Sequence, residues 1–105
     1  MSNSTRLERL KVMLEESPKE PFLLFAMAKE YEKMEDKPTA FHWYHQLLEM
    51  APDYVGTYYH LGKLYETQAD WEQAEITYEK GMEVAKAAGD RHAYGELQGA
   101  LDMMG

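Results

Sequence analysis

The sequence predicts an all-α protein of antiparallel helix hairpins that stack on one another, and the main evidence is an internal repeat. Aligned with itself at a shift of 34 residues, the 105-residue chain matches apolar, small, charged and aromatic positions in order. This period is typical of a helix–turn–helix unit, which stacks on its own copies because it cannot bury its apolar face alone. No stretch alternates with the period of two expected of a strand. The matched pairs are Leu24 with Tyr58, Met27 with Leu61, Ala28 with Gly62, Lys29 with Lys63, Tyr31 with Tyr65, Asp36 with Asp70, Ala40 with Ala74 and Tyr44 with Tyr78.

The first two helices are separated by a proline. The first is expected to start after Ser4 or Thr5, because either side chain can cap the free N–H groups of a first turn. It ends before Pro18, which disfavours the helical conformation of the preceding residue. The second runs from about Pro21, a favoured first-turn residue, to about Met34. The inward positions are Leu7, Leu10, Met13 and Leu14 in the first helix, and Leu24, Met27, Ala28 and Tyr31 in the second.

The third and fourth helices repeat this arrangement. Asp36 is expected to cap the third helix, with Pro38 in its first turn. This helix ends near Met50, and the fourth runs from about Tyr54 to Thr67. Connections of a few residues make neighbouring helices antiparallel. The inward positions are Ala40, Tyr44, Leu47 and Leu48 in the third helix, and Tyr58, Leu61, Gly62 and Tyr65 in the fourth.

The fifth and sixth helices complete the prediction. Asp70 followed by Gln73 resembles a capping box at the start of the fifth helix. Gly89 ends that helix, because glycine is the usual residue at a helix C-terminus. The sixth covers about Arg91 to Met104. The inward positions are Trp71, Ala74, Tyr78 and Met82 in the fifth helix, and Tyr94, Leu97, Leu101 and Met104 in the sixth.

Composition and charge narrow the function classes. The net charge is −8 and the pI is near 4.9, which argues against nucleic acid because phosphate binding needs clustered Lys and Arg. The absence of cysteine excludes disulfides, thiolate metal sites and a thiol nucleophile. No apolar run approaches the length of a membrane span, and the N-terminus lacks the apolar segment of a secretory signal. These features predict a soluble cytoplasmic protein of one domain.

The repeated positions resemble the tetratricopeptide repeat family. Residues 21–54 and 55–88 form the two repeats that match its pattern, except that Leu47 stands where a small residue is usual and Lys86 where proline is usual. The missing proline predicts a fifth helix extended by a turn. The resemblance implies a right-handed superhelix of helix hairpins, with residues 5–18 as a half repeat and 89–105 as a capping helix. The residues that carry it are Leu24, Met27, Ala28, Tyr31, Ala40, Tyr44 and Pro52, and then Tyr58, Leu61, Gly62, Tyr65, Ala74, Tyr78 and Gly81.

Small residues inside the helices predict close helix packing. Gly62 in a helix interior costs about 1 kcal/mol relative to alanine. We expect a bulky neighbour, such as a tyrosine of the adjacent helix, to fill the space that its missing side chain leaves. The repeated tyrosines are expected to be core residues with their hydroxyl groups at the edge of the core.

The resemblance also implies a binding face. In this family the first helices of successive repeats line a concave groove that holds a peptide or helix of a partner protein. Aromatic residues there would serve as interface anchors. The alternative is that Phe22 and Phe25 pack against the N-terminal helix. The implied groove residues are Phe22, Phe25, Lys29 and Glu32 from the first repeat, and Tyr59, His60, Lys63 and Glu66 from the second.

An enzyme or metal site is the remote alternative. His42 and His45 are three residues apart, and Glu49 follows four residues later, a spacing that can bind a transition metal. The resemblance places them on the outer, solvated side of the helix, without a second shell of ligands. There is no nucleophile–base pattern and no glycine-rich phosphate loop. We therefore expect neither catalysis, nor a metal, nor a cofactor.

Self-association is the second candidate function. Several apolar residues exceed the needs of a two-repeat core, and exposed apolar surface can mark an interface. A homodimer through the ends of the stack is the alternative to a module that binds a partner peptide. The residues that suggest it are Leu7, Val12, Phe41, Trp43 and Met103.

Overall fold

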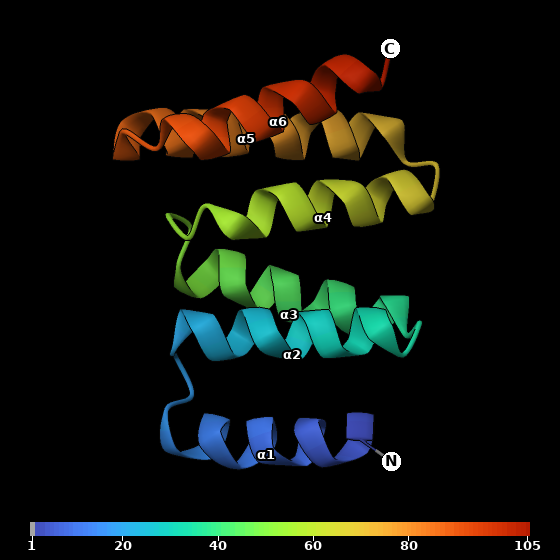
Figure 1. The fold of residues 1–105 in the computed structure, drawn as a ribbon, viewed down its shortest axis with the longest axis vertical. Coiled ribbons are helices and arrows are strands. Elements are labelled where there is room, and N and C mark those ends of the chain that lie inside the picture. The colour runs from blue at the N-terminus through green and yellow to red at the C-terminus, as the bar shows by residue number, and fades with distance from the viewer. Residues whose placement is uncertain (1) are drawn as a thin grey trace. The chain divides into compact units, whose positions relative to one another are not determined.

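The computed structural model describes residues 2–105, and the side chains of residues 5–105. In this part of the chain every regular element is an α-helix, as predicted (Figure 1). No helix of residues 2–105 combines the length and apolarity needed to cross a membrane. The helices are α1 (Ser2–Glu16), α2 (Pro21–Lys33), α3 (Lys37–Met50), α4 (Gly56–Thr67), α5 (Trp71–Ala88) and α6 (Arg91–Met103).

Four of the six helices begin and end within one residue of the predicted positions, and two begin elsewhere. Helix α1 begins at Ser2, so Ser4 and Thr5 lie inside it, and the prediction that it starts after one of them was wrong. No glycine or proline precedes Thr5 to stop the helix. The side chain of Ser4 lies outside the described residues. Helix α4 begins at Gly56, because Tyr54 and Val55 form a tighter turn in which the N–H of Thr57 donates to the Tyr54 carbonyl at 3.2 Å.

The chain divides into two compact units, Met1–Ala51 and Pro52–Gly105. The first contains α1 to α3, and one part of its core lies between α1 and α2. Leu7 is 8% exposed and belongs to this core, so its assignment to surplus apolar surface was wrong. Leu10 and Leu14 follow Leu7 at helical spacing and pack against α2, so Leu7 lies on the same side of α1 and faces α2 as well. The residues of this part of the core are Leu7, Leu10, Leu23, Ala26 and Met27, with Leu14, Tyr31 and Trp43 packed against them.

The second unit contains α4 to α6 and depends on two close helix approaches. A Cβ atom added to Gly62 of α4 would lie 2.2 Å from the Cε1 atom of Tyr78 in α5. One added to Gly81 of α5 would lie 2.5 Å from the Cβ atom of Tyr58 and 3.0 Å from Leu97 of α6. The predicted tyrosine of the adjacent helix therefore fills the space at Gly62, which confirms the reason given for this glycine.

The connection between consecutive helices uses the same backbone turn three times. Glu35, Ala69 and Gly89 have φ values of 61°, 58° and 71°, the left-handed conformation that ends many helices. The next residue is an aspartate in each case, and its N–H donates to the carbonyl five residues earlier. Its carboxylate then accepts a hydrogen bond from a backbone N–H of the following helix, at 3.0 to 3.3 Å. The predicted caps Asp36 and Asp70 are confirmed, and Asp90 is a third.

Each pair of repeat helices is joined by the same polar contact, from a tyrosine to a partly buried glutamate. The hydroxyl group of Tyr44 in α3 donates to Glu32 in α2, and that of Tyr78 in α5 donates to Glu66 in α4. Both tyrosines are fully buried. Burial first, and then the hydrogen bond to the carboxylate, raise the pKa of both phenols well above the ordinary value of 10.0. Each hydrogen bond thus ties the second helix of a repeat to the first.

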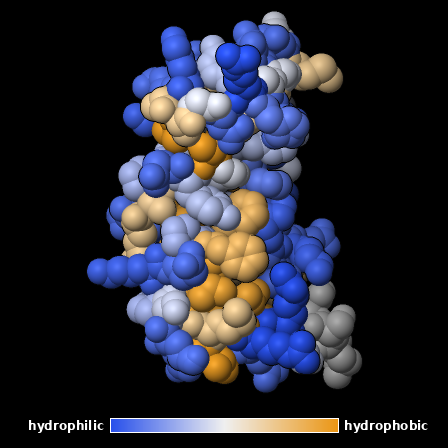
Figure 2. All heavy atoms as spheres, turned by 60° about the vertical axis from the view of Figure 1, so that its left-hand side comes forward, coloured by the Kyte–Doolittle hydropathy of each residue, from blue (hydrophilic) through white to orange (hydrophobic). Residues whose placement is uncertain are grey.

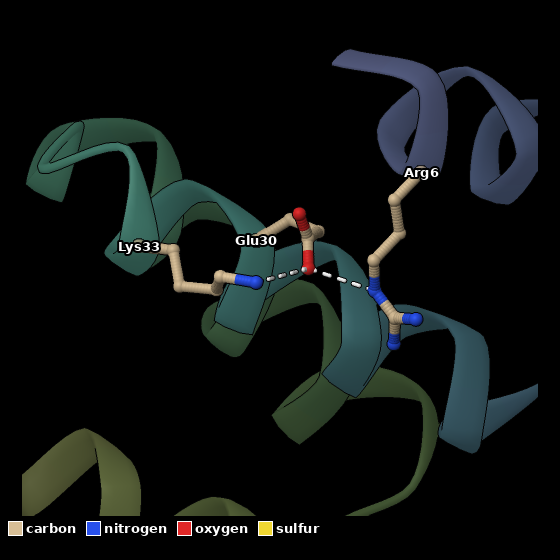
Figure 3. A network of polar contacts seen from close by, with 3 residues as sticks. All are labelled: Arg6, Glu30 and Lys33. Carbon is tan, nitrogen blue, oxygen red and sulfur yellow. Dashed lines mark hydrogen bonds and ion pairs between the residues drawn. The ribbon is translucent and has the colours of Figure 1, made fainter. Parts of the chain in front are cut away.

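A buried carboxylate joins α1 to α2. The side chain of Glu30 is only 3% exposed, and its Oε2 atom accepts a hydrogen bond from Nε of Arg6 at 2.8 Å. The Nζ atom of Lys33 lies 3.8 Å from the same oxygen (Figure 3). A buried charge is tolerated only when it is paired and hydrogen-bonded. Arg6 therefore compensates a charge that the contact with α1 would otherwise leave buried and largely unpaired.

Some large apolar side chains of the described residues stay exposed. Val12 is 58% exposed, Trp71 55%, Ile76 50% and Met103 85%. Figure 2 shows a face on which apolar residues remain uncovered among hydrophilic ones. Val12 and Met103 thus agree with the prediction of surplus apolar residues, whereas Phe41 and Trp43 are half-buried.

We predict that Gly62→Leu lowers the free energy of unfolding by about 1–3 kcal/mol, because the new side chain must displace the Tyr78 ring. Gly99→Leu in α6 is the matched control, since a Cβ atom there meets nothing within 4 Å. The control should leave the free energy unchanged or raise it by up to about 1 kcal/mol through helix propensity. Urea unfolding followed by circular dichroism measures both. Equal midpoints for wild type and Gly62→Leu would contradict the close approach.

We predict that Arg6→Ala lowers the free energy of unfolding by about 1 kcal/mol, because the buried Glu30 carboxylate loses its hydrogen-bond donor. Loss of one partner of a fully buried pair would cost more, but the Arg6 side chain is itself well exposed. Arg9→Ala, an exposed arginine on the same helix, should stay within about 0.5 kcal/mol of wild type. In a Glu30→Gln background the effect of Arg6→Ala should nearly vanish, since no buried charge then needs a partner. Equal effects in both backgrounds would show that the ion pair contributes nothing.

We predict a loss of stability above pH 10 that depends on Tyr44 and Tyr78. Their pKa values are higher in the folded state, so their contribution is complete below the unfolded pKa near 10 and declines as the pH rises above it. The slope should reach about 1.4 kcal/mol per pH unit for each tyrosine. Denaturant titrations between pH 9 and 11.5 measure it. The double variant Tyr44→Phe, Tyr78→Phe should show a shallower slope, and an identical slope would refute the assignment.

Candidate partner-binding site

The predicted site residues lie on the first helix of each repeat. Helix α2 carries Phe22, Phe25, Lys29 and Glu32, at intervals of three and four residues that place them along one side of a helix. Helix α4 carries Tyr59, His60, Lys63 and Glu66, of which the first, third and fourth share one side. The two sets belong to different compact units, the α2 set to the first and the α4 set to the second.

The set on α2 combines exposed aromatic surface with an ion pair. The Phe22 side chain is 59% exposed, so it does not pack into the core between α1 and α2. Phe25 is half-buried, and its ring meets that of Tyr44 edge to face, with 6.2 Å between centroids. The Nζ atom of Lys29 lies 3.7 Å from Oε2 of Glu32, the oxygen that accepts from Tyr44. The set therefore presents an aromatic end and a charged end.

The set on α4 repeats the charged part and changes the aromatic part. The Nζ atom of Lys63 lies 3.8 Å from Oε2 of Glu66 and 5.6 Å from the centroid of the Tyr59 ring, a cation–π distance. The His60 ring meets that of Tyr59 nearly at right angles, with centroids 5.5 Å apart. Tyr59 thus packs beside both Lys63 and His60. The half-buried Tyr59 ring therefore has the ammonium group of Lys63 on one side and the imidazole ring of His60 beside it.

Glu32 and Glu66 belong to the predicted binding face, although the contacts that hold their side chains were not predicted. Each glutamate accepts from the tyrosine twelve residues later, in the second helix of its own repeat. Each also lies near the lysine three residues earlier. The sequence does contain a sign of these hydrogen bonds, because Glu32 precedes Tyr44 by the same number of residues as Glu66 precedes Tyr78. Each lysine therefore lies beside a carboxylate that the tyrosine hydroxyl orients.

The histidine pair of α3 lies in different surroundings. His42 and His45 are both exposed, as the resemblance implied. The His42 ring meets Trp43 edge to face at 5.3 Å, and the His45 ring stacks on Phe41 at 6.3 Å. Among the described residues no three side chains of the kinds that bind metals are grouped closely enough to hold an ion. These contacts give the two rings ordinary packing partners.

Known proteins of similar structure indicate the family to which this chain belongs. No family model and no curated protein matches the chain. Among solved structures, a tetratricopeptide repeat domain protein from Salinibacter ruber is 44% identical in both its crystal and its solution structure. The crystal structure aligns with 78% of this chain and 91% of its own, with a TM-score of 0.74, and the solution structure with 80% and 85% and a TM-score of 0.77.

Two further structures are similar. Protein BPP2914 from Bordetella parapertussis is 30% identical, with 92% of this chain and 84% of its own aligned and a TM-score of 0.80. MamA shares the fold at 14% identity, with 97% and 70% aligned and a TM-score of 0.69. Domains of this kind are in general protein-interaction modules. The repeated positions and the 44% identity to the Salinibacter ruber domain together show that the chain belongs to the tetratricopeptide repeat family.

Proposed function

We propose that this chain is a non-catalytic interaction module that binds a segment of a partner protein on the faces of α2 and α4 defined above. The observation that carries the proposal is the repeated unit of a lysine, a glutamate and a buried tyrosine, found once in each repeat. Such a repeat presents one lysine on the first helix of each repeat, beside an oriented carboxylate. The family resemblance supplies the rest, since it implies that the first helices of successive repeats line one groove.

The chemistry of the two faces favours a partner segment with apolar side chains and acidic groups. Phe22, Phe25 and Tyr59 offer aromatic surface, which gives large contact area at low entropic cost. Lys29 and Lys63 are 38% and 43% exposed and offer ammonium donors. We propose a protein or peptide partner, in the cytoplasm, rather than nucleic acid or a membrane. The interface of a single segment is at the small end of specific complexes, so we expect micromolar affinity.

Self-association is the second candidate. Val12, Ile76 and Met103 are at least half exposed, and apolar surface of this kind can be covered by a second copy of the chain. Sedimentation velocity over a range of concentrations separates the two candidates. A monomer at all concentrations removes the homodimer, whereas a concentration-dependent dimer leaves it in place.

We predict that Lys29→Gln with Lys63→Gln weakens binding of the partner and reduces its salt dependence. Exposed charges are screened within about 10 Å at 0.1 M salt, so wild-type affinity should fall as salt is added. Partners captured from the source cell are compared between wild type and variant, and the affinity of each is then measured by calorimetry. The thermal midpoint should barely move, because exposed ion pairs contribute little to stability.

Phe25→Ala with Tyr59→Ala tests the aromatic part of the same faces and should also weaken binding. Loss of the edge-to-face contact with Tyr44 predicts a destabilisation of about 1 kcal/mol in addition. Val12→Ala with Ile76→Ala, two exposed apolar residues of α1 and α5, is the control and should bind as wild type does. If the partner still binds both the lysine and the aromatic double variants, or if the control loses it to the same extent, these faces are not the site.

A further inference from the structure

Helices α5 and α6 of the second unit enclose an open groove that the proposed function does not use. One hollow of about 450 Å³ lies where Trp71, Leu101 and Met104 come together. A second, of about 410 Å³, is lined by Met82, Tyr94 and again Leu101. Because Leu101 borders both hollows, they are adjacent. We call the two hollows together, with the five apolar or aromatic residues that line them, the α5/α6 groove.

The rim of the α5/α6 groove is strongly acidic. Glu72 and Glu75 line the first hollow, and Glu79 and Glu83 line the second. All four are exposed and follow one another on α5 at intervals of three and four residues, which places them on one side of the helix. Like charges at this spacing destabilise a helix. The positive groups close to the rim are Lys86, which lines the second hollow, and Lys80, whose Nζ atom lies 3.9 Å from Glu83. Arg91 lies beyond them, in an adjoining hollow that it lines together with Lys86 and Tyr94.

The dimensions of the groove suit a short helix. The acidic rim from Glu72 to Glu83 covers eleven helical steps, a length of about 16 Å. A helix of about three turns with basic residues at intervals of three and four has the same length and the same spacing of charges. Its apolar side would cover Tyr94, Leu101 and Met82, as in recognition of an amphipathic helix by an apolar groove.

We propose that the α5/α6 groove binds a basic amphipathic helix of a partner protein. The apolar side of that helix covers the floor of the groove, and its Lys or Arg side chains pair with the glutamates of α5. The site shares no residue with the faces of α2 and α4, which present lysine. The two sites therefore select segments of opposite charge.

A second copy of this chain fits the α5/α6 groove less well. None of the helices α1 to α6 has a net positive charge, and α1, which has the most basic residues, carries an equal number of acidic ones. Arg6 of that helix is already paired with the buried Glu30. The residues concerned are Arg6, Arg9 and Lys11 against Glu8, Glu15 and Glu16. Nucleic acid is disfavoured because the rim would repel its phosphates.

Tryptophan fluorescence offers a direct test. The chain has two tryptophans, so Trp43→Phe leaves Trp71, at one end of the groove, as the only one. The probe is a synthetic 14-residue peptide of leucine and lysine arranged as an amphipathic helix, titrated at 20 mM and at 300 mM salt. We expect a blue shift of Trp71 emission and micromolar binding that weakens at the higher salt. A peptide of the same composition in non-amphipathic order, and one with glutamate for lysine, should leave the emission unchanged.

Charge variants then locate the site. Glu72→Gln, Glu75→Gln and Glu79→Gln together should weaken peptide binding about tenfold at low salt, the effect of losing three exposed ion pairs. The matched control is Glu8→Gln, Glu16→Gln and Glu49→Gln, three exposed residues of α1 and α3 whose loss changes the net charge equally. The control should bind within twofold of wild type. Circular dichroism and the thermal midpoint confirm that both variants remain folded.

The results that overturn the proposal are distinct from those that overturn the proposed function. Equal weakening in both triple variants would mean attraction by net charge alone, and unchanged Trp71 emission would place the peptide elsewhere. Peptide binding that is lost in Phe25→Ala with Tyr59→Ala but retained in the α5 variant would assign it to the faces of α2 and α4. Sedimentation that shows a dimer disrupted by the α5 variant, without peptide, would make a second copy the occupant.

Discussion

The contact between Gly62 and the Tyr78 ring is the constraint on which the second unit depends. No other residue leaves room for the ring, because a Cβ atom would lie 2.2 Å from Cε1. This approach buries Tyr78 completely and directs its hydroxyl group to Glu66. Glu66 in turn lies near Lys63, which borders the Tyr59 ring. A single missing side chain thus influences a series of contacts that ends at the candidate binding face.

The first unit reaches the same polar arrangement with alanine in place of glycine. Ala28 is fully buried at the position equivalent to Gly62, and Tyr44 is buried and donates to Glu32. What distinguishes this unit is α1, which adds an apolar core and the ion pair of Arg6 with Glu30. Because Glu30 is buried, the charge of Arg6 becomes part of the packing of α1 on α2. The equivalent position in the second repeat is Leu64, a buried apolar residue.

The charges of the chain are distributed by helix in a way that net charge conceals. The first helices of the repeats hold their lysines beside glutamates that buried tyrosines orient. Helix α5 instead exposes four glutamates along an apolar groove. Surface charges of this kind contribute little to stability, so their arrangement bears mainly on which partner approaches and how fast. A protein with a net charge of −8 can therefore still present locally different surfaces.

The sequence by itself determined the helices, their order and the family, because hydrophobic periodicity, helix caps and the 34-residue repeat can all be recognised in the sequence without coordinates. It also determined that Gly62 needed a bulky neighbour, since an interior glycine has a cost that packing must offset. The start of α1 escaped it, because serine and threonine can cap a helix or lie within its first turn. The structure decided the burial of Leu7, the pairing of Arg6 with Glu30, the hydrogen bonds from tyrosine to glutamate and the α5/α6 groove. These features join residues of different helices, and only the packing of helices brings such residues together.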